Sequence, residues 1–99
     1  MKYTLGFVNR SRSTQDWAIY LDKVSIAQFS LPADGGSKYV PVEMKVGDEI
    51  AVTVSADQTA AATLTVNDKG KLILTSHTPR VWDLEQETGT QYVLYCTLS

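Results

Sequence analysis

The sequence predicts an all-β protein, folded as a small antiparallel two-sheet β-sandwich of about seven to nine strands. Three observations support this prediction. Short runs of alternating apolar and polar residues follow one another along nearly the whole chain, and turn-forming residues separate them at intervals of roughly ten residues. No window of about eleven residues or more shows the period of a helix. A small β-barrel is the alternative, because the same pattern suits both architectures.

The segment 60–76 specifies one hairpin closely. Its polar tip, Asn67 to Gly70, ends in glycine, which predicts a type I turn closed by a residue in the left-handed region. With Gly70 in a bulge, the expected cross-strand pairs are Val66–Leu72, Thr65–Ile73, Leu64–Leu74 and Thr63–Thr75. One face of the hairpin is then aliphatic and the other mostly hydroxylated, as a half-buried antiparallel pair requires.

The remaining strands follow from the same alternation, taken in chain order. Their expected ranges are 2–9, 16–23, 24–31, 38–44, 49–55, 81–84 and 91–98. Residues 9–15 form a polar loop and residues 32–36 a turn, whereas Asp22 and Lys23 form either a tight turn or a bend. Proline lacks the ladder donor, so the strand that holds Pro41 is expected at a sheet edge or with an irregularity there.

Length and charge limit the function classes. Ninety-nine residues predict a single domain, 1–99, with a core of its own. The net charge is −2 and the charges are interspersed, so the basic stripe of a nucleic-acid-binding protein is missing and no nucleic acid partner is expected. No apolar run is long enough for a transmembrane segment, and no signal peptide is recognisable. We expect a cytoplasmic protein, or one exported without a cleavable signal peptide.

Residues suited to catalysis or metal binding are scarce. His77 is the sole histidine and falls in a loop, where a solvated side chain is expected. Cys96 is the sole cysteine, so there is no internal disulfide, and its place in an alternating strand indicates a core residue. Asp83, Glu85 and Glu87 alternate but lack the glycine-punctuated loop of strong calcium sites. We therefore expect no enzyme, no metal site and no cofactor.

Arginine and tryptophan residues cluster in two places. Arg10 and Arg12 lie in the polar loop before Trp17, and Arg80 lies two residues before Trp82. Indole faces can stack on a sugar ring while guanidinium groups bind its polar substituents, which favours a non-catalytic binding module for a carbohydrate or another polar ligand. The candidate ligand-binding residues are Arg10, Arg12, Trp17, His77, Arg80, Trp82 and Asp83.

The two tryptophans differ in their expected exposure. Trp17 alternates with Ile19 and Leu21, so it is either a ligand-binding residue or the core tryptophan of the sandwich. Trp82 falls between Val81 and Asp83 and is the better candidate for exposure.

The C-terminal strand suggests a different function, self-assembly or protein interaction. Residues 91–98 carry no charge, and Val93 and Tyr95 lie on the face opposite to the expected core face. These two residues are the candidate interface. Either the rim of the other sheet covers them, or they form a homo-oligomeric interface; the pattern suits both.

Overall fold

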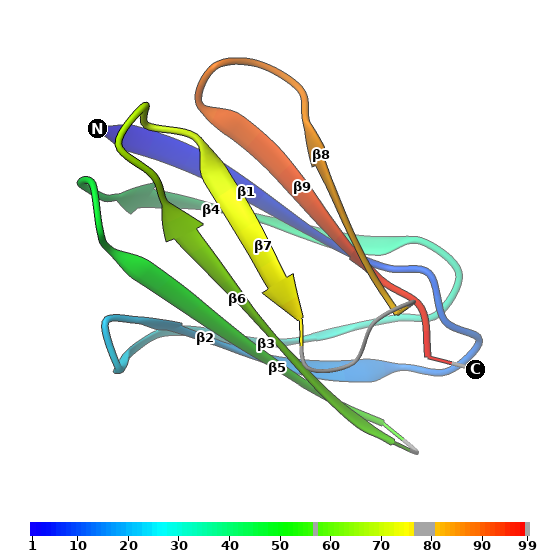
Figure 1. Cartoon of the computed structure of the whole chain (residues 1–99). Coiled ribbons are helices and arrows are strands. Elements are labelled where there is room, and N and C mark those ends of the chain that lie inside the picture. Colours follow the sequence, from blue (N-terminus) through cyan, green and yellow to red (C-terminus); the bar gives the residue numbers. More distant parts are fainter. Residues whose placement is uncertain (57, 77–80, 99) are drawn as a thin grey trace.

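The computed structural model describes residues 1–56, 58–76 and 81–98, and these ranges form nine strands and no helix (Figure 1). The strands are β1 Lys2–Asn9, β2 Gln15–Leu21, β3 Val24–Leu31, β4 Gly36–Glu43, β5 Glu49–Ser55, β6 Thr59–Val66, β7 Leu72–Ser76, β8 Trp82–Gln86 and β9 Gln91–Cys96. The all-β prediction is confirmed.

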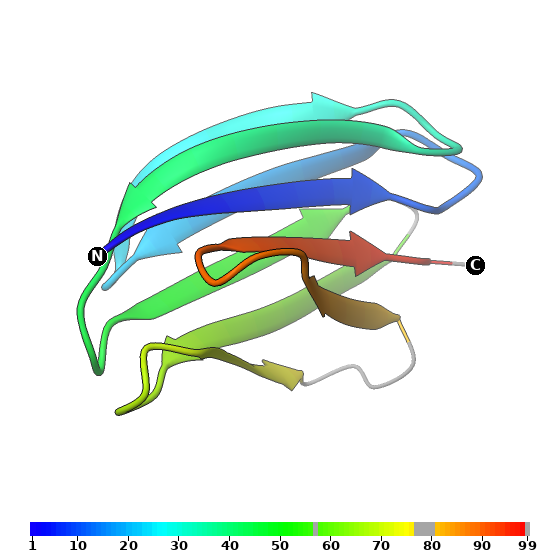
Figure 2. The ribbon, with the colours of Figure 1, turned by 90° about the horizontal axis from the view of Figure 1, so that it is seen from above.

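The strands form two open sheets packed face to face, so the β-sandwich is confirmed and the closed barrel is not formed (Figure 2). One sheet has four strands in the order β4-β1-β9-β8, and the other has five in the order β3-β2-β5-β6-β7. Every pair of neighbouring strands is antiparallel except β1 and β9, which run parallel. The first and last strands of the chain therefore lie side by side at the centre of the four-stranded sheet.

The core lies between the two sheets and is built from the apolar side of the predicted alternation. Each strand contributes every second residue, because successive side chains point to opposite faces of a sheet. The largest contributors, all buried, include Tyr3, Leu5, Phe7, Trp17, Ile19, Ile50, Val52, Val54, Leu64, Leu72, Tyr92, Leu94 and Cys96. Cys96 is a core residue, as predicted.

The β6–β7 hairpin has the predicted register in every pair. Val66 faces Leu72, and Leu64 faces Leu74. Gly70 has a φ of 77°, in the left-handed region, and its N–H donates to the Asn67 carbonyl over 2.9 Å. The Asn67 side-chain oxygen accepts from the N–H groups of Lys69 and Lys71, which fixes the tip. The turn residues at the tip, together with the alternation on either side, were enough to specify this hairpin.

Two tyrosines connect this hairpin to the four-stranded sheet. The Tyr3 hydroxyl on β1 donates to the Gly70 carbonyl over 2.7 Å, and the Tyr92 hydroxyl on β9 accepts from the Leu72 N–H over 3.3 Å. Both aromatic bodies lie in the core while their hydroxyls reach the edge of the opposite sheet, which is a common use of buried tyrosine. The two layers are thus joined by polar contacts as well as by packing.

Boundaries differ slightly from those predicted. Asp22 and Lys23 have φ values of 47° and 72°, so they form the tight turn of a β2–β3 hairpin of the type I′ class. Strand β8 extends to Gln86, beyond the expected end at residue 84, because Glu85 and Gln86 continue the ladder opposite Val93 and Tyr92. Pro41 lies on β4, an edge strand, as its missing donor requires.

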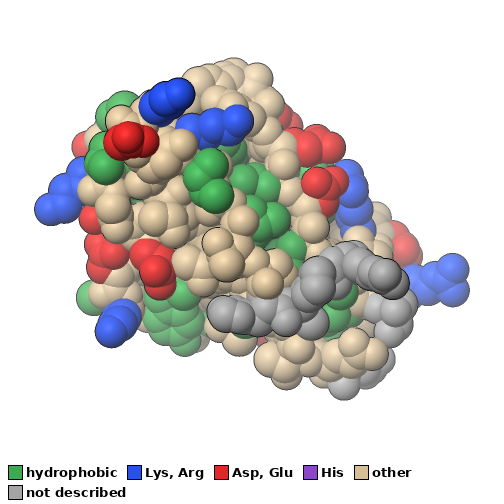
Figure 3. Space-filling model, in the orientation of Figure 1, with side chains coloured by type: hydrophobic (Ala, Val, Ile, Leu, Met, Phe, Trp, Pro, Cys, Tyr) green, Lys and Arg blue, Asp and Glu red, His purple; other side chains and the backbone are tan. Residues whose placement is uncertain are grey.

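The surface shows charges of both signs interspersed. On the face drawn in Figure 3, acidic and basic side chains alternate around the rim and hydrophobic ones show nearer the centre. Within the described ranges, there is no helix of the length and apolar character needed to cross a membrane.

Candidate functional site

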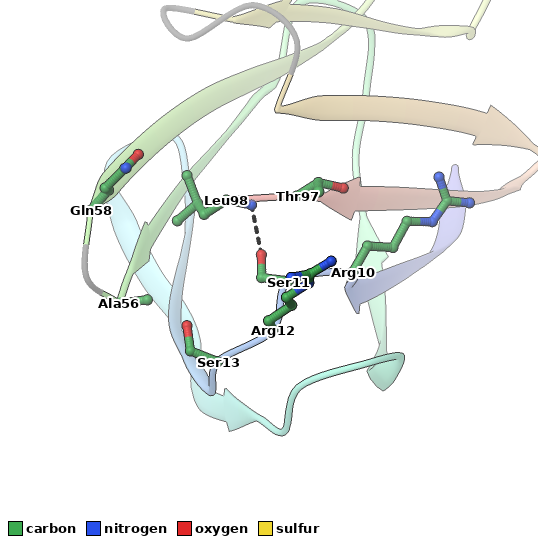
Figure 4. A pocket seen from close by; sticks show the side chains of 8 residues that line it. All are labelled: Arg10, Ser11, Arg12, Ser13, Ala56, Gln58, Thr97 and Leu98. Atoms are coloured by element: carbon green, nitrogen blue, oxygen red, sulfur yellow. Dashed lines mark hydrogen bonds between the residues drawn. The ribbon is translucent and has the colours of Figure 1, made fainter.

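A pocket of about 580 Å³ opens at the end of the sandwich where strands β1 and β9 end (Figure 4). Three segments distant in sequence meet there: the β1–β2 loop, the connection from β5 to β6, and the chain after β9. The described residues that line it are Arg10, Ser11, Arg12, Ser13, Ala56, Gln58, Thr97 and Leu98. Both arginines of the predicted loop therefore lie at a concave surface, where a ligand can be surrounded.

The β1–β2 loop is held from beneath by Asn9, which is completely buried. Its side-chain nitrogen donates to the carbonyls of Ser13 and Leu31 over 2.9 and 3.0 Å. Its side-chain oxygen accepts from the Ser11 N–H over 2.7 Å. A buried amide with its donor and acceptor both satisfied keeps the surrounding backbone in one conformation.

Ser11 is the centre of a second set of buried contacts. Its Oγ accepts from the Gln15 side-chain amide over 2.7 Å and from the Leu98 N–H over 2.6 Å, and it donates to the Cys96 carbonyl over 3.4 Å. These bonds connect the loop to the chain end on the other side of the pocket, and Figure 4 draws the one to Leu98. The pocket wall is therefore a hydrogen-bonded structure rather than a loose loop.

The network ends in the hydrophobic core. The Gln15 side-chain oxygen accepts from the Trp17 indole N–H over 3.1 Å, which satisfies the one polar atom of that ring. The Gln15 amide also lies 3.7 Å from the Cys96 sulfur. An indole in the core is thus only two hydrogen bonds away from the serine that lines the pocket.

Sequence reasoning missed Asn9, Ser11 and Gln15, although the sequence held a signal. Asn9 and Ser11 continue the inward parity of Phe7, and Gln15 has the inward parity of Trp17. Polar residues with inward parity on two successive strands and the loop between them indicate a buried hydrogen-bond network, because such groups are costly to bury alone.

Arg10 is engaged on the outer face of the four-stranded sheet. Its guanidinium carbon lies 3.5 Å from the centre of the Tyr95 ring, and one of its nitrogens lies 3.7 Å from an Asp83 carboxylate oxygen. The Tyr95 hydroxyl donates to Glu85 over 3.2 Å. Burial, and then the charge of Glu85, raise the pKa of Tyr95. The predicted residues Arg10 and Asp83 are therefore neighbours. Tyr95 on β9 contacts Arg10 and is the strand partner of Asp83 on β8.

Arg12 has a different environment. It lies on the exposed part of the loop and lines the pocket, and within the described ranges no ion pair involves it. Figure 4 shows the Arg10 guanidinium pointing away from Ala56 and Gln58 on the opposite wall. Arg12 is thus the pocket cation that no carboxylate in the described chain neutralises.

Trp82, the better candidate for exposure in the sequence, is buried, as is Trp17. Trp82 is 9% exposed and Trp17 is 2% exposed. Trp82 lies opposite Cys96 on the inward face of β8, and the two indoles meet edge to face with ring centres 5.9 Å apart. Phe29 stacks on Trp17 with ring centres 6.2 Å apart. Both indole rings are therefore packed in the core, and neither is available to stack on a sugar. The sequence neighbours Val81 and Asp83 do not show which way Trp82 points, because its direction depends on its position in the alternation of β8.

The sequence leaves open what covers Val93 and Tyr95, and the structure shows what covers Val93. Both residues do point away from the core face, but Val93 is 1% exposed in the single chain. Its strand neighbours are Gly6 and Glu85, and the Tyr39 ring lies on Gly6. Residues of the same chain therefore cover Val93, and no second copy is needed to bury it.

Two predicted residues, His77 and Arg80, lie outside the described residues. In the described part of the chain, no group of three or more histidine, cysteine or acidic side chains is placed to hold a metal ion. Asp83 and Glu85 are exposed on β8, and Glu87 is exposed beyond its end.

A second, shallower depression of about 440 Å³ lies on the outer face of the five-stranded sheet. It forms where the small side chain of Ala18 lies between Gln28 on β3 and Thr53 on β5. Its carboxylate, Asp16, already accepts a hydrogen bond from Ser30. None of its described lining residues is a cation, so the loop pocket is the better candidate for a charged or polar ligand.

No protein-family model matches this sequence, and no curated protein matches it as a relative.

Proposed function

We propose that this chain is a non-catalytic binding module whose loop pocket takes a polar ligand, with a carbohydrate as the favoured class. One observation carries the proposal: the pocket combines guanidinium, hydroxyl and amide groups with the apolar side chains of Ala56 and Leu98. Sugars need both kinds of contact, because their hydroxyls require hydrogen-bonding partners while their C–H faces pack on apolar groups. Neither Trp17 nor Trp82 is among the described lining residues, so neither belongs to the proposed binding site.

The order of the pocket wall supports binding. Asn9 holds the loop backbone, and Ser11 connects it to Leu98. A wall already fixed in the free protein loses little conformational entropy when a ligand binds, so more of the contact energy remains as affinity.

The reactivity of the nearby groups supports a role without catalysis. Burial raises the pKa of the Cys96 thiol to about 11, so the thiol is protonated at neutral pH and a poor nucleophile. The Ser11 hydroxyl proton is directed to the Cys96 carbonyl. Neither group is prepared for attack on a substrate.

Assembly through the C-terminal strand is less well supported. Strand β9 is paired on both sides, by β1 and β8, so its backbone has no free edge. Val93 is covered within the chain, and the Tyr95 ring is covered by Arg10. We therefore propose binding in the pocket rather than association through Val93 and Tyr95.

The test is a fluorescence titration with a panel of mono- and oligosaccharides. Trp17 reports on the pocket through Gln15 and Ser11, so a saturable change in its emission is expected for a ligand. Ser13→Leu places a larger apolar side chain in the pocket lining and should abolish the change. Ser25→Leu on β3, at the end of the sandwich away from the pocket, is the matched control and should retain it. A flat response across the panel, or binding that survives Ser13→Leu, would contradict the proposal.

A further inference from the structure

We infer that the ligand of the loop pocket carries a negative charge, as a sugar bearing a carboxylate or sulfate group does, and that Arg12 binds this charge. The inference rests on the proposed function and specifies its ligand class. Its basis is the pair of arginines in the described lining and the absence of a partner for Arg12 among the described residues.

The described part of the pocket lining carries two cations in a protein that is acidic as a whole. The chain has eleven acidic and nine basic residues, and two of its three arginines are among the eight described lining residues. A cation at a concave surface is less completely hydrated than one on a convex surface, so an anionic ligand gains more from meeting it there.

The two arginines have different roles. Arg10 stacks on Tyr95 at 3.5 Å and pairs with Asp83 at 3.7 Å, so contacts within the protein already satisfy its charge. For Arg12, the described residues provide neither an ion pair nor an aromatic ring. Its planar guanidinium matches the two oxygens of a carboxylate or sulfate, which makes bidentate binding possible.

The backbone on both sides of Arg12 is fixed. Asn9 accepts from the Ser11 N–H over 2.7 Å on one side and donates to the Ser13 carbonyl over 2.9 Å on the other. The Asp34 N–H donates to the Ser11 carbonyl over 2.9 Å from the neighbouring turn. An arginine whose Cα is held on both sides loses only its side-chain freedom on binding, a smaller entropic cost than ordering a whole loop.

The test compares matched neutral and acidic sugars on the intact chain. Isothermal titration uses methyl glucuronide against methyl glucoside, and N-acetylglucosamine 6-sulfate against N-acetylglucosamine. A charge-assisted hydrogen-bonded pair predicts that the acidic member binds about ten- to hundredfold more tightly. Arg12→Gln replaces the guanidinium by a neutral amide that can still donate hydrogen bonds, and should reduce this preference to within a factor of about three. Lys69→Gln, at the hairpin tip, removes a surface charge outside the pocket and should leave the preference unchanged.

The outcomes separate the inference from the proposed function. Equal affinity for the acidic and neutral sugars would overturn the inference and leave the binding module standing. A preference for the acidic sugars that survives Arg12→Gln would also overturn it. Binding of none of these sugars or of any other glycan would overturn the proposed function. Circular dichroism of each variant confirms that it is folded, and the exposed position of Arg12 makes this the expected result.

Discussion

The Gln15 side-chain nitrogen and the Ser11 Oγ meet inside the protein at a distance of 2.7 Å. This bond joins the second strand to the loop that precedes it, and through Gln15 the loop is connected to the Trp17 indole. The residue that lines the pocket and the largest side chain of the core therefore belong to one hydrogen-bonded unit. The stability of the fold and the shape of the pocket depend on the same few polar atoms.

Ser11→Ala should be strongly destabilising. It removes the acceptor of two buried donors, the Gln15 amide and the Leu98 N–H. Unsatisfied buried donors cost about 1–3 kcal/mol each, so we expect a loss of about 3 kcal/mol in the free energy of unfolding. Chemical denaturation measures it. Ser37→Ala, at an exposed position on β4, is the control and should change stability by less than about 0.5 kcal/mol. Equal effects of the two changes would show that the buried network contributes nothing.

Gly70→Ala should destabilise the hairpin. Gly70 has a φ of 77°, which is strained for a residue with a Cβ, and an added Cβ would lie 2.6 Å from Met1 Cε. A loss of about 1–2 kcal/mol is expected in thermal unfolding. Gly89→Ala is the matched control, since a Cβ there meets no atom within 4 Å, and its effect should be small. A Gly70 variant as stable as the Gly89 variant would contradict the bulged turn.

Val93→Lys tests the corrected view of the outer face. Because Val93 is 1% exposed, the lysine must bury a charge or displace its cover, and a loss of about 3 kcal/mol or more is expected. Ile73→Lys on β7 is the control, because Ile73 is 44% exposed. Thermal melts and light scattering are measured together. A Val93 variant with native stability but a lower mass would show that the residue lies in an interface between copies.

The alkaline limit of stability should depend on Cys96. Burial raises the pKa of its thiol from 9.0 to about 11, so above pH 9 the unfolded chain loses this proton before the folded chain does. The unfolded state then binds fewer protons, and the stability falls by about 1.4 kcal/mol per pH unit between these two values. Below pH 9 this contribution is fully present. Cys96→Ala should flatten the fall in this window, apart from the parts due to Tyr3 and Tyr95, whose pKa values burial also raises. An unchanged slope in the variant would contradict the assignment.

The sequence was sufficient for features that depend on local chemistry. Alternation specified the strands and the buried parity, and the Asn67–Gly70 tip fixed the register of its hairpin. The fold class followed from these two signals. The place of Pro41 at a sheet edge followed from its missing N–H.

Features that depend on long-range pairing could not be derived in this way. Nothing local to β1 or β9 indicates that they lie parallel and adjacent, and this pairing is what brings Arg10 against Tyr95 and Ser11 against Leu98. Trp82 was the better candidate for exposure because one sequence neighbour is apolar and the other is charged. In the structure it pairs with the buried Cys96 and points into the core. The sequence thus draws attention to the two arginines that line the pocket, whereas it gives no direct sign of the buried amides and hydroxyl that hold the pocket wall.

The most direct test of pocket binding is an NMR titration of the ¹⁵N-labelled chain with the sugar panel, following the amide and indole N–H signals. Binding in the pocket should cause saturable shifts at Ser11, Arg12, Ser13, Thr97 and Leu98 and at the Trp17 indole, with little change at the hairpin tip or at residues 22–23. Shifts confined to other surfaces, or spectra unchanged at saturating sugar, would contradict it.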